Sequence, residues 1–229
     1  TGTITFVQVK DGAPHSAQST VAVAYPSAQS AGNLNVVVVG WGDTVQSVLS
    51  VTDSKGNVYT PAVGPTINSG AGLSQTVFFA KNIAAAAAGA NTVTVTFDGA
   101  AAFPDIRILE YSGVDVSTPV DVTAQAIGNG STSSTPAVAT TNAVDLLFAT
   151  NVVATVSTAA GSGFTSRIIS PDGNIAEDRM VTATGSYSAT ATLNSGQWVM
   201  QMVAFRASGS PPPPPDTVPP TNPSGLTAT

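Results

Sequence analysis

The side chains that could perform acid–base catalysis are few in this chain. It contains two glutamates, Glu110 and Glu177, and a single histidine, His15. Glycoside hydrolysis requires two carboxyl groups at a defined separation, one of them with a raised pKa, and a Ser-His-Asp triad would have to use His15. Glu110 lies inside an apolar run, and no Gly-x-Ser-x-Gly motif is present. The sequence therefore predicts that the chain is not an enzyme and has no catalytic residue.

An ion pair is the structural alternative for these charged residues. A charge inside a protein is retained where it is paired or hydrogen-bonded, so we expect Glu110 or Glu177 to pair with an arginine within a β-sheet. The candidate arginines are Arg107, Arg167 and Arg179. His15 lies in a polar stretch and is expected to be solvated.

Aspartates supply the one candidate metal site. The chain has no cysteine, which excludes thiolate nucleophiles, disulfides and Cys-ligated zinc, and a single histidine excludes a His-rich site. Calcium prefers carboxylate and carbonyl oxygens, which loops can provide. No Asp-x-Asp-x-Asp-Gly loop is present. The expected ligands of a structural Ca²⁺ are Asp115, Asp121, Asp172 and Asp178, and no other cofactor is expected.

Aromatic residues give the candidate binding surface. A protein holds a sugar with an exposed aromatic face and a few hydrogen-bonding groups. Trp41 ends an apolar run just before Gly42, so its ring could reach the rim of the fold, whereas Tyr25 and Tyr59 stand beside a proline or a turn and are expected to be exposed. Trp198 shares one strand face with Met200 and Met202, which favours the core.

The elements that must position these residues are short strands. β-branched and aromatic runs recur between Gly, Pro, Asn, Asp and Ser, which is typical of a sandwich or barrel. Residues 36–39 are apolar on both faces and are expected to be central, and Ala84–Ala88 are expected to form a helical turn. Turns are predicted at 53–57, 172–174 and 194–196. The expected strands are 3–10, 19–25, 34–41, 46–52, 57–60, 75–80, 92–97, 106–111, 121–127, 146–150, 164–169, 179–183, 186–193 and 198–205.

These strands predict an all-β fold over residues 1–207. We expect a two-sheet antiparallel β-sandwich of the jelly-roll type. The alternative is two consecutive Ig-like sandwiches divided near Gly128–Thr135, the internal stretch whose composition resembles a linker. We prefer one domain, because a polar loop of this length is ordinary in a large sandwich.

Three segments resemble a known class of module. They are Val51-Thr-Asp-Ser-Lys-Gly-Asn-Val-Tyr59, Phe79-Ala-Lys-Asn82, and Ile108-Leu-Glu-Tyr-Ser-Gly-Val-Asp115 together with Pro119-Val-Asp121. They resemble turns and strands in the β-sandwich accessory modules of large secreted bacterial multi-domain proteins. The resemblance implies a non-catalytic module of a cell-surface protein or a secreted polysaccharide-active enzyme, and it carries over no catalytic residue.

The last residues indicate a linker and a second module. Residues 208–218 contain five consecutive prolines, Pro211–Pro215, which favour a stiff polyproline II spacer. Residues 219–229, with Pro219-Pro220 and Gly225-Leu226, resemble the start of a fibronectin type III domain. A module of a longer protein is the expected setting.

Composition sets the expected setting and partners. Only seven residues are Lys or Arg and the net charge is −6, so nucleic acid is not an expected partner. No apolar run reaches the ~20 residues of a membrane span. The absence of cysteine, the few lysines and the many Thr and Ser residues favour an exported bacterial protein, at the cell surface or secreted, and the start at Thr1 is expected of a mature or trimmed product.

Two functions follow from these expectations. The first is binding or cell adhesion through a polysaccharide or cell-surface glycan. The alternative is a structural subunit of a surface filament or layer. It would assemble with its own copies by lending a strand, either Thr3–Lys10 or the C-terminal tail, to a neighbour's sheet.

Overall fold

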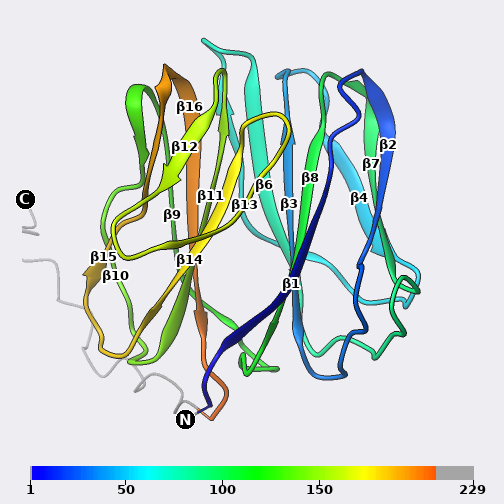
Figure 1. Ribbon diagram of the computed structural model, residues 1–229, viewed down its shortest axis with the longest axis vertical. Coiled ribbons are helices and arrows are strands. Elements are labelled where there is room, and N and C mark those ends of the chain that lie inside the picture. Colours follow the sequence, from blue (N-terminus) through cyan, green and yellow to red (C-terminus); the bar gives the residue numbers. More distant parts are fainter. Residues whose placement is uncertain (1, 210–229) are drawn as a thin grey trace, which may run out of the picture.

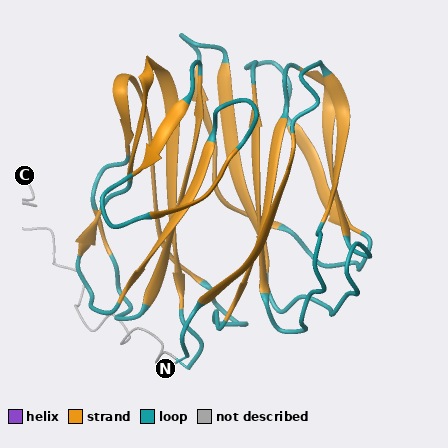
Figure 2. Ribbon diagram, viewed as in Figure 1, coloured by secondary structure: helices purple, strands orange, loops and turns teal. Residues whose placement is uncertain are grey.

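A computed structural model of the chain describes residues 2–209. Within this range the chain forms strands and loops and no helix, and therefore no helix long and apolar enough to cross a membrane (Figure 2). Most of the predicted linker and the whole fibronectin-like segment 219–229 lie outside the described residues. The expected all-β antiparallel sandwich is confirmed, whereas the jelly-roll connectivity stays a prediction.

A five-stranded sheet, here called the central sheet, forms the middle of the molecule (Figure 1). Its strands are antiparallel and follow the order β1 (Thr5–Gly12), β8 (Asp105–Ser112), β3 (Leu34–Trp41), β6 (Leu73–Ala80) and β5 (Thr60–Asn68). The β1 strand pairs with β8 of its own chain, so the segment expected to be lent to a neighbour is used internally.

Two further sheets cover the two faces of the central sheet. The outer sheet has the order β2 (Gln18–Ala24), β7 (Thr92–Ala101) and β4 (Val48–Asp53). The C-terminal sheet has the order β12 (Ser157–Ala160), β16 (Thr190–Arg206), β11 (Asp145–Val153), β14 (Ile175–Val181) and β13 (Thr165–Ile169), and β9 (Val120–Ser134) pairs with β16. A small pair, β10 (Val138–Ala139) and β15 (Ser186–Tyr187), completes the strands of the described region.

The apolar character of β3 is explained by this stack of three sheets. Successive side chains of a strand point to opposite faces. Val37 and Val39 therefore pack against the outer sheet, and Val36 and Val38 pack against the C-terminal sheet. All eight residues of β3 are buried. The prediction of a central strand is confirmed, and the stack has one more layer than the expected two-sheet sandwich.

The second face of the C-terminal sheet is covered by the sheet itself. The first half of β16 curls over, so Ala191 and Leu193 pack in one cluster with Leu147 and Met200. Trp198, Met200 and Met202 are buried here, as their spacing predicted. The Gly128–Thr135 stretch is not a linker between sandwiches, because nearly all of it lies in β9, paired along β16.

Three local predictions were wrong for physical reasons. Ala84–Ala88 form no helical turn, because five alanines cannot nucleate a helix and Ala86 exchanges both of its backbone hydrogen bonds with Gln29 (2.8 and 3.1 Å). Residues 194–196 are a bulge inside β16 rather than a turn.

The strand expected at 57–60 begins at Thr60 and runs to Asn68. The sequence pattern did not indicate this strand because it contains Gly64 and two prolines, which disfavour strands. An edge strand tolerates both residue types. The turns at 53–57 and 172–174 are confirmed.

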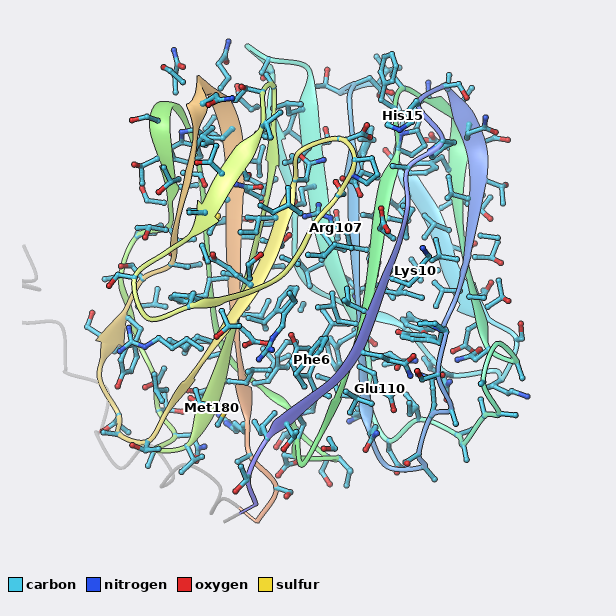
Figure 3. The ribbon with its side chains drawn as sticks, viewed as in Figure 1. Phe6, Lys10, His15, Arg107, Glu110 and Met180 are labelled. Atoms are coloured by element: carbon cyan, nitrogen blue, oxygen red, sulfur yellow. The ribbon has the colours of Figure 1, made fainter. Side chains whose placement is uncertain are left out.

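The two ends of the described chain meet at one end of the molecule (Figure 1). The amide of Gly2 donates to the carbonyl of Ser208 (2.8 Å), and the amide of Ser208 donates to the carbonyl of Gly113 (2.7 Å). The loop that joins β1 to β2, and that carries His15, lies at the opposite end (Figure 3).

Candidate functional site

The loops at that opposite end enclose a cleft of about 290 Å³, here called the loop-end cleft. It is lined by the β3–β4 connection, the β7–β8 loop, the β11–β12 connection and the β13–β14 turn. Its lining residues include Trp41, Phe103, Thr155, Asp172 and Asn174. The remaining lining residues are apolar, so the cleft combines a mainly apolar lining with a small number of polar groups.

Phe103 is the exposed aromatic residue of this cleft. It lies two residues after the end of β7, and 59% of it is exposed. The loop that carries it is fixed: the amide of Ala102 donates to Oδ2 of Asp43 (2.7 Å), and the amide of Gly42 donates to the carbonyl of Ala102 (2.6 Å). The ring is therefore presented to solvent by a loop anchored to the neighbouring β3–β4 connection.

Backbone strain marks the same end of the fold. Phe103 has a φ of 43° and His15 a φ of 54°, and Asn82 is the third non-glycine residue at positive φ within residues 2–209. The left-handed region costs a bulky side chain of order 1–3 kcal/mol, and such strain gathers at ligand sites. Two of these three residues flank the loop-end cleft, because Phe103 lines it and His15 contacts its wall.

Asp172 is the one charged residue that lines the loop-end cleft. Nδ1 of His15 lies 2.7 Å from its Oδ1, and 58% of the histidine side chain is exposed. Burial raises the pKa of Asp172, and the nearby carboxylate of Asp105 raises it further. Asp105 itself is buried and accepts hydrogen bonds from Ser170 and Asn174.

Arg107 is the buried cation behind this group. It is fully buried in the interior of the molecule (Figure 3), and its Nε lies 3.5 Å from Oδ1 of Asp105. Its Nη1 donates to the hydroxyl of Thr150 and to two backbone carbonyls, and its Nη2 donates to Oε1 of Gln75. These contacts tie the central sheet to the C-terminal sheet directly beneath the cleft.

The four predicted calcium ligands are not brought together. Asp172 contacts His15, and Asp178 makes a two-bond ion pair with Arg167 (2.7 and 2.8 Å). Asp121 pairs with Arg206 (2.8 Å), whereas Asp115 accepts the amides of residues 117 and 118. Within residues 2–209 no three Asp, Glu, His or Cys residues are arranged to hold a metal ion.

The three predicted ligand-binding aromatics lie mainly inside the fold. Tyr25 is fully buried, and its hydroxyl donates to the carbonyl of Leu109 (3.2 Å). The prediction that it is exposed was wrong, because the 83–91 segment that follows β6 hydrogen-bonds to both Tyr25 backbone groups. Tyr59 is half-buried and donates to Oδ2 of Asp53 (2.9 Å). Trp41 is 2% exposed, yet its ring forms part of the cleft wall.

The predicted glutamate–arginine pairs do not form in the described part of the chain. Glu110 is buried and accepts hydrogen bonds from the amides of Gln8 and Asn33, whereas Glu177 accepts the backbone amide of Gly161 (3.0 Å). Arg107 and Arg167 pair with aspartates instead. The prediction was wrong because the hydrogen bonds that the two glutamates accept come from neutral amide groups, and the arginines do not contact them.

A second cleft of about 270 Å³ opens between β4 and β5, the edges of the outer and central sheets. Trp41, Val48, Pro61, Ile67 and Phe78 are among its lining residues. Two strongly exposed apolar residues stand next to it in sequence, Val45 at 79% and Leu49 at 69%. It is more apolar in character than the loop-end cleft and no charged residue lines it.

Sequence reasoning missed Phe103. The available signal was an aromatic residue followed directly by Pro104, in a short loop between two expected strands. Comparison with protein-family models, with curated proteins and with solved structures gives no match for this chain.

Proposed function

We propose that the chain is a non-catalytic carbohydrate-binding module that holds a polysaccharide or cell-surface glycan in the loop-end cleft. The observation that carries this proposal is the ring of Phe103, exposed in a fixed loop and held in a strained conformation beside a carboxylate. A secreted or surface location and a place in a larger adhesive protein remain part of the proposal.

The chemistry of the cleft supports sugar binding rather than sugar cleavage. The apolar face of a sugar ring packs on an aromatic side chain, while Asp172 and Thr155 provide oxygen atoms for its hydroxyl groups. Hydrolysis would require two carboxyl groups that both reach the glycosidic bond. Asp172 provides the one carboxyl group among the residues that line the cleft, and Asp105 behind it is 1% exposed.

Replacing Phe103 by alanine is expected to weaken glycan binding roughly tenfold, the upper range of one aromatic contact. The full chain is tested for retention on a panel of insoluble polysaccharides and for binding to soluble oligosaccharides by calorimetry. Ile127→Ala is the matched control, because Ile127 is 50% exposed on β9, outside the cleft lining. Failure of the unmodified chain to bind any member of the panel, or equal binding by Phe103→Ala, would contradict the proposal.

The edge of β4 favours a second function, assembly with copies of the same chain. Among the described strands β4 pairs only with β7, so its outer edge presents unpaired backbone groups. Leu49 on this strand and Val45 just before it are exposed beside the second cleft. Exposed strand edges with apolar side chains are templates for pairing with another chain, and a β4–β4 contact between two copies is the proposed first step of a filament or layer.

Replacing Leu49 by lysine is expected to block this assembly, because a charged side chain on an edge strand opposes pairing. Sedimentation velocity of the full chain over a hundredfold concentration range should show oligomers that Leu49→Lys loses. Ile127→Lys, a charge on another exposed strand, is the control. A single monomeric species at the highest concentration rules this second function out.

A further inference from the structure

We propose that the loop-end cleft selects amino sugars that carry a free ammonium group over neutral, N-acetylated and acidic sugars. The inference rests on the proposed carbohydrate-binding function and names the class of its ligand. It follows from the charges around the cleft and from the aromatic residue that lines the same cleft.

The charges around the cleft favour a cation. Asp172 is the one charged lining residue, and Asp105 stands behind it. The cation in this region, Arg107, is fully buried and its Nη groups are committed to oxygen atoms of the sheet interface. No lysine or arginine lines the cleft. An anionic sugar would therefore meet the carboxylate of Asp172 with no lysine or arginine in the lining, whereas an ammonium group would be attracted to it.

The hydrogen bonding of the two carboxylates points the same way. Oδ2 of Asp172 and Oδ1 of Asp105 are buried atoms with no hydrogen-bond donor in the described chain. Only the pair with His15 compensates Asp172 at short range, and that histidine side chain is 58% exposed. Burial and the nearby carboxylate of Asp105 raise the pKa of Asp172, although His15 and Arg107 act in the opposite direction. Because Arg107 Nε lies 3.5 Å from Oδ1 of Asp105 and Asp105 does not line the cleft, Asp172 is the group that a bound ammonium would meet, with a positive charge and up to three N–H donors.

Phe103 provides the second half of an ammonium site. A cation placed over an aromatic face within about 6 Å is attracted to the ring. Phe103 and Asp172 line one cleft of about 290 Å³, which is large enough for a sugar residue. A glucosamine unit packed on Phe103 therefore has a carboxylate within reach of its amino group, an arrangement that an N-acetyl group cannot exploit.

The experiment compares four hexasaccharides on the full chain by calorimetry at pH 6. They are β-1,4-glucosamine, its N-acetylated form, a neutral β-1,4-glucan and an oligogalacturonate. We expect the glucosamine hexamer to bind about tenfold or more tightly than the other three, which is the usual size of one charge-assisted hydrogen bond. Its affinity should fall with added NaCl because a partly exposed ion pair is screened by salt.

Asp172→Asn isolates the charge with almost no change in shape. We expect it to weaken glucosamine binding about tenfold while the weaker binding of the neutral glucan stays within twofold. The control Asp98→Asn changes an exposed aspartate on β7 and should leave both affinities unchanged. The preference of the unmodified chain among the four sugars tests the inference even if Asp172→Asn folds poorly.

The outcomes separate this inference from the proposed function. Tight, salt-sensitive binding of the glucosamine hexamer that needs Phe103 and Asp172 supports both. Binding of the neutral or N-acetylated sugar with equal or higher affinity, lost in Phe103→Ala, overturns the ammonium selectivity and leaves carbohydrate binding intact. Absence of binding to all four sugars and to the polysaccharide panel overturns both.

Discussion

Replacing Arg107 by methionine is expected to lower the free energy of unfolding by about 3–5 kcal/mol, the usual effect of removing one partner from a buried ion pair. The methionine fills a similar volume but donates no hydrogen bond. Asp105, which is 1% exposed, would lose its cationic neighbour, and Oε1 of Gln75 would lose a donor. Chemical denaturation of the full chain at pH 6 measures the change.

Two further variants separate charge from packing in this test. Arg179→Met is the control, because Arg179 on β14 is half-buried, and its effect should stay below about 1 kcal/mol. Adding Asp105→Asn to Arg107→Met should recover part of the loss, since the uncompensated carboxylate is then neutral. Equal stability of Arg107→Met and Arg179→Met would show that the buried ion pair has no role in stability.

The protein is expected to lose stability as the pH rises from about 5 to 8. Burial raises the pKa of Asp145 to about 7 and that of Glu177 to about 7. Both residues are fully buried, and Oδ2 of Asp145 and Oε1 of Glu177 have no hydrogen-bond partner in the described chain. These acids hold their protons in the folded state and release them in the unfolded state above their ordinary pKa values.

The sign of this effect follows from proton binding. Between the ordinary pKa near 4 and the folded pKa near 7, the folded state binds more protons than the unfolded state. Stability therefore falls with rising pH across this window and levels off above it. One pKa unit corresponds to about 1.4 kcal/mol, so the loss is on the order of 3 kcal/mol for each group.

The opposite sign applies to the carboxylates whose pKa is lowered. Hydrogen bonds from backbone amides lower the pKa of Asp115, and the pKa values of Asp53 and Asp121 are lowered by hydrogen bonds that outweigh their burial. These groups lose their contribution as the pH falls below about 4. We therefore expect maximal stability near pH 4 to 5, between the loss on the acid side and the decline toward pH 7.

Neutral variants test the pH prediction directly. Asp145→Asn and Glu177→Gln should each flatten the decline above pH 5, and each should be more stable relative to the unmodified chain at pH 8 than at pH 5. Unfolding by urea is followed at both pH values, with Asp98→Asn as the control for an exposed carboxyl group. A stability that rises from pH 5 to 8 would contradict the assignment of both buried acids.

The strands were the part of the fold that local sequence could predict. The bounds of β3 agree with those expected from its apolar run, because a strand buried on both faces carries no polar interruption. The Trp198, Met200 and Met202 face was predicted from the period of two along a strand. By contrast, β5 was shifted because Pro61, Gly64 and Pro65 oppose strand formation locally, and its pairing with β6 overrides that preference.

The candidate site depended on contacts that no local pattern encodes. Asp172 was identified as a candidate ligand residue, but for a metal ion. Its neighbours His15 and Asp105 are separated from it by 157 and 67 positions in the sequence. Phe103 and Asp172 line the same cleft because the β7–β8 loop and the β13–β14 turn, which belong to different sheets, meet at this end of the fold. Single-sequence reasoning therefore found the aromatic and acidic residue types but not the pair.

The meeting of Gly2 and Ser208 determines how the module can be displayed. The described chain enters and leaves the fold at one end, and the loop-end cleft opens at the other (Figures 1 and 3). A support attached through either terminus would therefore hold the cleft outward. A pulling force applied between the two termini would break the terminal hydrogen bonds one after another. It would not shear whole strands past each other. The fold thus places its two points of attachment at one end and the loop-end cleft, the proposed binding surface, at the other.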